Sequence, residues 1–239
     1  MNEFILNPHE LTPVLEDNGM CLKRDNLFRF VPGYTGTKAR ICMLLAQGKS
    51  GLTTCHIPYS PQGPVVAATA EGMGIPCRIH TIAECLPELE GKANGADIIV
   101  HPEWYRATDA AMNDSKITGF QFMPRDFDCT EGHQSIIAQC QNIPDHIERV
   151  VIQAYSGATA IAILEGLIKW NKKAGLIVVC QRLGADLNFE LFAPLGWQKR
   201  VTFIHLSLES NQFNPHLAAT AEAFTCKNKL WWITGSVGR

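Results

Sequence analysis

Short apolar segments alternate with longer segments of helical periodicity along most of the chain, and this alternation is the feature that most restricts its fold. Several of the apolar segments are continuous, as expected of parallel strands that are covered on both faces. The pattern therefore predicts an α/β fold with mostly parallel sheets. The predicted strands lie at residues 51–57, 76–82, 96–101, 118–123, 149–155, 175–181, 200–206 and 229–234. The predicted helices lie near residues 37–47, 61–73, 103–114, 131–141, 157–172 and 214–224.

The composition excludes several classes of function. A chain of 239 residues can form one large domain or two small lobes with proper cores. The formal net charge is −2 and no basic block occurs, which argues against broad electrostatic capture of nucleic acid or anionic lipid. No segment approaches a membrane span, and the first 15 residues lack the pattern of a secretory signal. We therefore expect a cytoplasmic globular protein.

The cysteines and histidines do not form a recognisable metal motif. The nine cysteines are odd in number and contain no CxxC pair, which favours reduced thiols packed as small apolar groups in a cytosolic protein. The eight histidines are scattered, and none falls at the spacing of a structural zinc site. We expect no metal cofactor.

A strand, a turn of small residues and a helix follow one another at "AYSGAT", residues 154–159. This arrangement directs several unpaired backbone N–H groups toward one point, where an anion such as a phosphate can bind. Small residues at such turns also occur for packing alone, so the motif by itself leaves both interpretations open.

The segment "GYTGTKAR" places Lys38 at the start of a predicted helix. It is not a nucleotide-binding P-loop, because that motif needs glycine directly before the lysine and a hydroxyl residue directly after it. Here Thr37 precedes and Ala39 follows Lys38. From these residues alone, a solvated lysine at a helix start is the simpler interpretation.

Three segments in order resemble a known enzyme group. They are "CLKRDNLFRFVPGYTGTKARICMLL", "SPQGPVVAATAEGMGIPC" and "AYSGATAIAILEGL". They are similar to the lysine segment, the substrate loop and the phosphate loop of fold-type II pyridoxal 5'-phosphate (PLP) enzymes. The greatest similarity is to the 1-aminocyclopropane-1-carboxylate (ACC) deaminase and D-cysteine desulfhydrase family. Two weaker similarities, at "GHQSIIAQC" and "LWWITGS", extend the resemblance from about residue 22 to residue 236 in family order.

The resemblance assigns roles to individual residues. Lys38 takes the place of the lysine that forms a Schiff base with PLP and then moves a proton at the substrate α-carbon. Backbone N–H groups at the start of the helix would hold the cofactor phosphate, and Thr234 would donate a hydrogen bond to the pyridine nitrogen. The implied cofactor-binding residues are Lys38, Ser156, Gly157, Ala158, Thr159 and Thr234, and the implied substrate-binding residues are Ser60, Gln62 and Tyr34.

Some of these residues have simpler interpretations that remain open. Ser60 followed by Pro61 also fits a helix N-cap with proline at the first helical position. Gln62 also fits a surface glutamine, and Thr234 fits a strand-end residue bonded to the backbone.

The resemblance also implies an architecture and a reaction. We expect a larger PLP-binding lobe of residues 1–47 and 126–239, a smaller lobe of residues 48–125, and PLP between them at the carboxyl ends of strands. A neutral partner for the pyridine nitrogen makes the ring a milder electron sink, which suits α,β-elimination on an amino acid. By resemblance we expect a lyase that acts as a homodimer on an amino-acid-type substrate.

The sequence departs from the family at positions that contact the cofactor and substrate. Pro61 and Gln62 stand where the family has asparagine and histidine, and Ala158 stands where glycine is usual. Ala158 fits only if its φ is negative. Two alternatives follow. One is decarboxylation or β-replacement on an amino acid attached to a nucleotide or carrier, as in viral base hypermodification. The other is a non-catalytic PLP-fold binding protein.

Overall fold

The computed structural model describes residues 6–17, 20–31, 33–58, 60–93, 95–154, 157–181, 200–206 and 228–234. The helices are α1 (Thr37–Ala46), α2 (Gln62–Met73), α3 (Leu86–Leu89), α4 (Trp104–Thr118), α5 (Thr130–Gln139) and α6 (Ala158–Lys169). The first strands are β1 (Val14–Asp17), β2 (Met20–Arg24), β3 (Arg29–Val31), β4 (Tyr34–Thr35), β5 (Leu52–Cys55) and β6 (Cys77–Ile82). The later strands are β7 (Ala96–His101), β8 (Gln121–Met123), β9 (Arg149–Ala154), β10 (Gly175–Gln181), β11 (Val201–Leu206) and β12 (Lys229–Ile233).

These elements confirm the predicted α/β class with mostly parallel sheets, and every predicted strand overlaps an observed one. The start of the strand predicted at 118–123 was wrong. Helix α4 continues to Thr118 and ends at Gly119, whose left-handed φ of 73° ends the helix. The helix predicted near 214–224 lies outside the described residues. Within the described ranges, no helix is long and apolar enough to cross a membrane.

The chain forms two compact units, each made of segments distant in sequence. The first contains Met1–Glu10, Asn26–Gly132 and Thr234–Arg239, and the second contains Leu11–Asp25 and His133–Ile233. These units divide the chain differently from the two expected lobes, because the helix that carries Lys38 is grouped with the segment 48–125. The lobe boundaries themselves stay a prediction.

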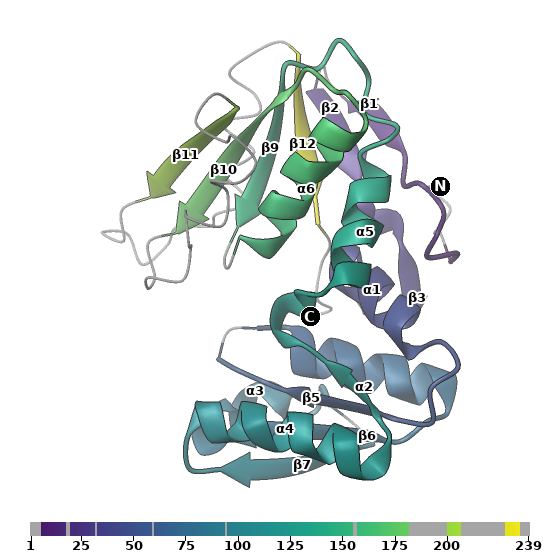
Figure 1. The fold of residues 1–239 in the computed structure, drawn as a ribbon, viewed down its shortest axis with the longest axis vertical. Helices are drawn as coiled ribbons and strands as arrows, with labels where there is room; N and C mark the ends of the chain where they lie inside the picture. The colour runs from purple at the N-terminus through teal and green to yellow at the C-terminus, as the bar shows by residue number, and fades with distance from the viewer. Residues whose placement is uncertain are drawn as a thin grey trace. The chain divides into compact units, whose positions relative to one another are not determined.

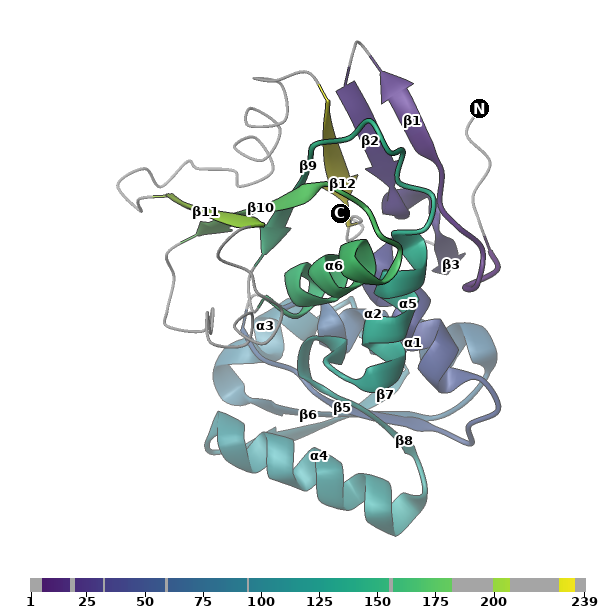
Figure 2. The ribbon, with the colours of Figure 1, turned by 45° about the horizontal axis from the view of Figure 1, so that its top comes forward.

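The first unit is built on a parallel sheet with the strand order β7-β6-β5-β8. All four strands of this sheet lie between residues 48 and 125. Neighbouring residues of β5 face helices on opposite sides of the sheet, since Thr54 accepts a hydrogen bond from Gln62 of α2 and Cys55 accepts one from Thr108 of α4. Figures 1 and 2 show α2 and α4 on either side of these strands.

The second unit is built on a sheet with the strand order β1-β2-β12-β9-β10-β11. Only the β1–β2 pair is antiparallel. Helix α6 packs on β9 and β10 (Figure 1). It also approaches α5 closely at Gly166, where an added Cβ would lie 2.4 Å from the sulfur of Cys140.

Strands β1 and β2 were not predicted, because their polar residues hide the strand pattern. The structure shows that Lys23 and Asp25 are fully buried. The Lys23 ammonium donates to the backbone oxygen of Thr12 at 2.6 Å and to Asn142 Oδ1 at 2.7 Å, and it lies over the ring of Trp232. Thr12 donates in turn to the carboxylate of Asp25 at 2.9 Å. The "KRD" segment therefore joins the N-terminal hairpin to the rest of the second unit.

Candidate active site

Lys38 lies in the first turn of α1, and backbone hydrogen bonds from the two preceding residues fix the start of this helix. Gly36 precedes the helix with a φ of 90°, a conformation that side chains rarely permit. Its N–H donates to the carbonyl of Phe28, and the Thr37 N–H donates to the carbonyl of Thr234 at 2.8 Å. The predicted Lys38 and Thr234 are thus brought together, since the backbone of Thr234 caps the helix that carries the lysine.

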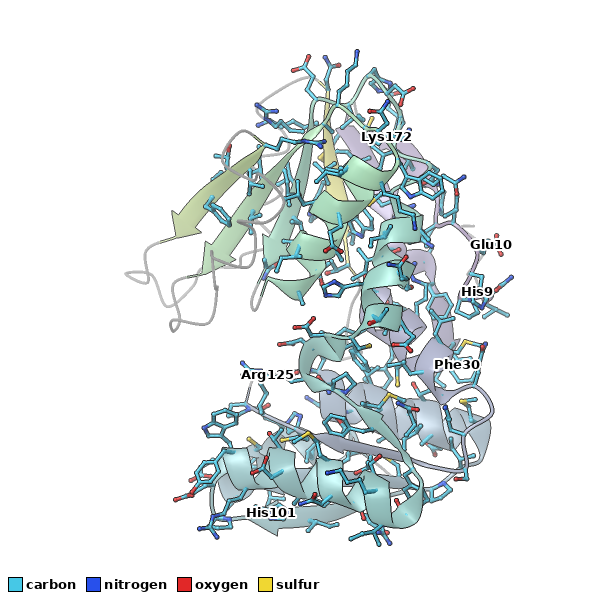
Figure 3. All side chains as sticks on the ribbon, in the orientation of Figure 1. His9, Glu10, Phe30, His101, Arg125 and Lys172 are labelled. Carbon is cyan, nitrogen blue, oxygen red and sulfur yellow. The ribbon has the colours of Figure 1, made fainter. Side chains whose placement is uncertain are left out.

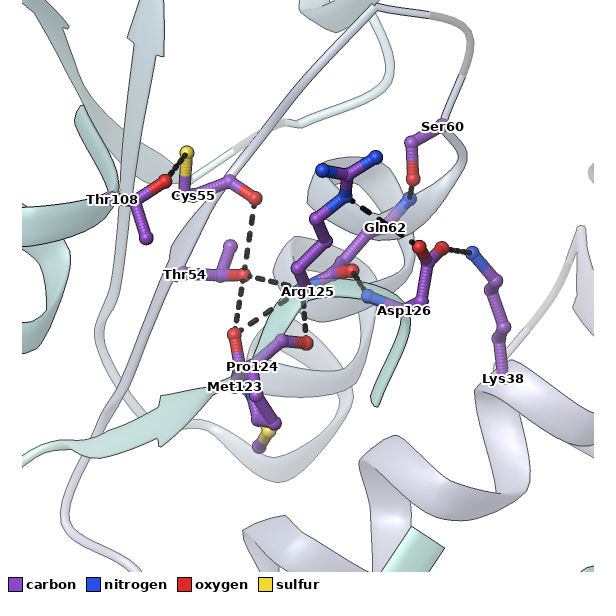
Figure 4. Close-up of polar contacts among 10 residues, drawn as sticks. All are labelled: Lys38, Thr54, Cys55, Ser60, Gln62, Thr108, Met123, Pro124, Arg125 and Asp126. Carbon is purple, nitrogen blue, oxygen red and sulfur yellow. Dashed lines mark hydrogen bonds and ion pairs between the residues drawn. The ribbon is translucent and has the colours of Figure 1, made fainter. Parts of the chain in front are cut away.

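The Lys38 ammonium forms an ion pair with Asp126, a residue that the sequence did not indicate. Lys38 Nζ lies 3.0 Å from Asp126 Oδ1, and the two side chains are 31% and 17% exposed (Figure 4). The other carboxylate oxygen of Asp126 lies 3.7 Å from Nε of Arg125. Lys38 is therefore held by a carboxylate and yet remains partly open to solvent.

Gln62 fixes the backbone that presents Asp126. It is 2% exposed, and its Nε2 donates to the hydroxyl of Thr54 at 2.9 Å and to the carbonyl of Pro124 at 2.8 Å. A third acceptor, the carbonyl of Met123, lies at 3.2 Å, and Oε1 accepts the backbone N–H of Asp126 at 2.7 Å (Figure 4). These contacts favour a supporting role for Gln62 over the substrate contact implied by resemblance.

Ser60 and Tyr34 also have partners within the first unit. Ser60 Oγ accepts the N–H of Gln62, the first residue of α2, at 3.3 Å, and Pro61 occupies the N-cap position. The Tyr34 hydroxyl donates to the carbonyl of Lys92 at 3.2 Å, and burial raises the pKa of this phenol. Their roles toward a substrate stay predictions.

The predicted phosphate loop belongs to the second unit. Gly157 has a φ of 93° and precedes α6, whose first intrahelical hydrogen bond is donated by Ile161 to the Gly157 carbonyl. The N–H groups of residues 158–160 therefore come before that bond and are placed as in an anion site. Ala158 is not among the described residues with positive φ, so the condition for alanine at this position is met. Ser156 and its neighbour Tyr155 lie outside the described residues.

The second unit contains a cavity that shares no residue with the predicted site. It measures about 670 Å³, lies at the amino ends of β9 and β12, and is lined by Asp145, His146, Ile147, Glu148, Arg149, Lys173, Ile177 and Lys229. Ligands of parallel α/β sheets bind at the carboxyl ends of strands, so this cavity is not the expected cofactor site. Among the described residues, no group of histidine, cysteine and acidic side chains could hold a metal ion.

Comparisons with known proteins place the fold. No family model and no curated protein matches the sequence. Among solved structures, an ACC deaminase homologue matches with a TM-score of 0.68 at 16% identity, over 99% of this chain and 92% of that chain. The chain has the fold of the fold-type II PLP enzymes. Threonine deaminase isoform 2 from Solanum lycopersicum (TM-score 0.67, 13% identity, 95% of this chain, 79% of that one) has the same fold. A PLP-dependent aspartate racemase also has this fold, with a TM-score of 0.63 at 15% identity, over 95% of this chain and 90% of that chain.

The fold-type II likeness confirms the fold class that the motifs implied. Threonine deaminase and aspartate racemase carry out different reactions on amino acids, as their names state, so the shared fold does not select one reaction. Asp126 was missed because it lies in a turn after β8 whose only signal in the sequence is Pro124 followed by polar residues.

Proposed function

We propose that this chain is a PLP-dependent enzyme that abstracts the α-proton of an amino acid or of an amino-acid-bearing substrate, with α,β-elimination as the reaction. The observation that carries the proposal is Lys38. It occupies the lysine position of the motif, lies at a fixed helix start, and presents a partly exposed amine paired with Asp126. By resemblance, we also propose a cytoplasmic homodimer.

Each unit, taken by itself, carries residues of the kind that PLP needs. The first unit supplies the amine that would bond to the cofactor aldehyde, and Thr234 adjoins it. The second unit supplies the start of α6, where Gly157 takes the left-handed conformation and the N–H groups of residues 158–160 precede the first helical bond. A phosphate dianion suits such a helix start. The small side chain of Ala158 does not require a positive φ there.

The reaction would divide between the cofactor and the chain. When bound, PLP supplies an electron sink for the pair left at the substrate α-carbon. Lys38 Nζ takes the α-proton and becomes an ammonium. The carboxylate of Asp126, 3.0 Å away, accepts a hydrogen bond from that ammonium and stabilises it. Gln62 keeps the carboxylate in place through the Asp126 backbone.

The substrate loop supports a substrate that differs from those of the resembled family. Pro61 has no N–H and no side-chain donor, and the amide of Gln62 is already bonded inside the unit. The hydroxyl of Ser60 then remains as the polar side chain at this helix start. We propose that the substrate carries its own polar groups, such as an attached nucleotide or carrier, as a second candidate to a free amino acid.

Covalent labelling tests the proposal. The purified protein is saturated with PLP, reduced with borohydride, digested and mapped by mass spectrometry. The pyridoxyl mass should lie on the peptide that contains Lys38, and Lys38→Ala should abolish it. Lys49→Ala, a change in an exposed lysine just after the same helix, is the matched control and should label fully. Label on another lysine, or none, would refute the proposed role.

The phosphate half is tested separately by Gly157→Val. Valine cannot take the left-handed conformation without strain and brings bulk to the helix start. The variant should fold, as judged by circular dichroism, but should lose PLP binding and labelling. If Gly157→Val binds PLP normally, the phosphate site lies elsewhere.

A further inference from the structure

Strand β7 forms one edge of the four-stranded sheet of the first unit, and one face of this strand carries exposed aliphatic side chains. Ile98 and Val100 are 39% and 48% exposed, although they lie within a six-residue strand. The strand pairs with β6 along its whole length without a break in register. Its other edge therefore presents a continuous row of backbone donors and acceptors.

Edge strands are usually protected against pairing with another chain. The common devices are short length, proline, lysine, bulges and charges directed inward. The opposite edge of this sheet has such protection, since β8 is only three residues long. Within β7 the only charged residue with a fixed charge is Asp97, which is largely exposed. The strand is thus suited to accept a further strand.

The sequence of β7 is complementary to itself in one antiparallel register. Side chains alternate between the two faces, with Ile98 and Val100 on one face and Asp97, Ile99 and His101 on the other. A two-fold axis at Ile99 places each residue i opposite residue 198 − i of the second copy. Asp97 then lies opposite His101, and Ile98 lies opposite Val100, each pair twice.

The neighbouring registers lack this complementarity. Shifting the axis to Ile98 places Asp97 opposite Ile99, and shifting it to Val100 places His101 opposite Ile99. Two polar side chains that can hydrogen-bond across the strands, such as Asp97 and His101, stabilise a sheet, whereas a charge opposite an aliphatic side chain does not. His101, labelled in Figure 3, is already held in place, since its Nε2 lies 3.0 Å from Nδ1 of His80 and the two rings stack.

We propose that two copies of this chain pair through β7, antiparallel about a two-fold axis at Ile99, and so join their parallel sheets into one continuous sheet. The contact is isologous, because the same strand serves on both copies. It covers Ile98 and Val100 and satisfies the open backbone edge. This assignment is independent of the cofactor and stands whether or not Lys38 binds PLP.

Light scattering after size exclusion, over a series of protein concentrations, tests the contact. Ile98→Lys places a charge in the pair and should halve the molar mass of the assembly. Ile117→Lys, at an 84% exposed position on α4, is the matched control and should leave the mass unchanged. Val100→Lys should repeat the effect of Ile98→Lys, and circular dichroism checks that all three variants fold.

Cysteine cross-linking tests the register. Directly opposite residues of antiparallel strands have Cα atoms about 4.5–5.5 Å apart, within the range that a disulfide spans. Ile99→Cys should therefore give a disulfide-linked dimer on mild oxidation, above the background of the unaltered protein. Ile98→Cys and Val100→Cys should give much less, since neither faces itself.

Several results would overturn the proposal. One is an unaltered protein that stays monomeric at every concentration, which would leave a strand of a different protein as the occupant of this edge. Another is an Ile98→Lys variant with the same mass as the unaltered protein. A third is cross-linking at Ile98 or Val100 that exceeds cross-linking at Ile99, because it would place the axis elsewhere.

Discussion

Asp126 adopts a left-handed backbone conformation, with a φ of 55°, and the next residue, Phe127, has a φ of 56°. Such conformations cost on the order of 1–3 kcal/mol in non-glycine residues and persist where surrounding contacts impose them. Here the contacts come from Gln62, which accepts the Asp126 N–H, and from Lys38, which binds the carboxylate. Local strain thus presents a carboxylate to the amine of the proposed catalytic lysine.

Replacing Asp126 separates its charge from its backbone role. Asp126→Asn keeps the size of the side chain and should lower the rate of α-proton exchange by roughly tenfold, because a charge-assisted hydrogen bond to Lys38 is lost in a partly exposed pair. The rate is measured as deuterium incorporation at the substrate α-carbon. PLP labelling of Lys38 should persist.

Asp126→Gly is the matched variant. It removes the same charge but relieves the left-handed backbone, so its free energy of unfolding should equal or exceed that of the unaltered protein. The exchange rate should nevertheless fall as in Asp126→Asn. Full activity in both variants would show that the ion pair plays no part in the reaction.

The individual site residues were predictable to different degrees. Lys38 was indicated only by the resemblance of its segment to a family motif, because the residues around it alone favour a solvated lysine. Gly157 was indicated by a turn of small residues between a strand and a helix, a pattern that is readable from the sequence. The supporting function of Gln62 could not, because it depends on Thr54, Pro124 and Asp126, which are brought near it only by the parallel sheet. A ligand-contacting glutamine and a buried one look the same in a sequence.

At the level of secondary structure, the contact between α5 and α6 depends on a missing side chain. Gly166 lies in the buried face of α6, and a Cβ there would be 2.4 Å from Cys140 Sγ and 3.1 Å from the Cα of Ile137. The close approach also lets the indole N–H of Trp170 donate to the Ile137 carbonyl at 2.9 Å. The glycine therefore determines the spacing between the two helices.

We expect Gly166→Ala to destabilise the protein by about 1–3 kcal/mol, as overpacking does. Helix propensity alone would predict a gain of up to about 1 kcal/mol, so the two effects differ in sign. The free energy of unfolding in urea measures the outcome. Adding Cys140→Ala should recover part of the loss, since the nearest atom is removed. A stabilised Gly166→Ala variant would contradict the close contact.

Continuous apolar strands such as β9 and β10 could be predicted from the sequence because they are buried on both faces. The hairpin of β1 and β2 could not, since Lys23 and Asp25 read as solvent-exposed residues. A buried lysine is stable only where its donors are satisfied. Its acceptors are Thr12, near in sequence, and Asn142, more than 100 residues away. No local pattern contains that information.

For the whole molecule, two buried histidines make stability depend on pH. Burial lowers the pKa of His56, against the opposing effect of Glu88, and burial also lowers the pKa of His80, against that of Asp114. The unfolded chain therefore binds protons more readily than the native protein does as pH falls below about 6.5. The contribution of these two histidines to the free energy of unfolding is therefore constant above that pH and decreases below it.

Urea unfolding at about pH 7.5 and about pH 5.5 measures this dependence. Each histidine should contribute a loss of at most about 1.4 kcal/mol per pH unit below its unfolded pKa. His56→Gln and His80→Gln should each make the loss smaller, whereas His9→Gln, at an exposed position, should leave it unchanged. An unaltered protein that is equally stable at both pH values would contradict the burial of these rings.

Strand β12 lies between β2 and β9 in the interior of the larger sheet, and it pairs in parallel with β2, from which it is separated by about 200 residues. During synthesis, β1 and β2 leave the ribosome long before the strand that must join them to the rest. The sheet can close only when β12, about 200 residues later in the chain, has emerged from the ribosome. Until then two apolar strand edges stay open, and a chaperone that shields such edges would reduce aggregation during expression.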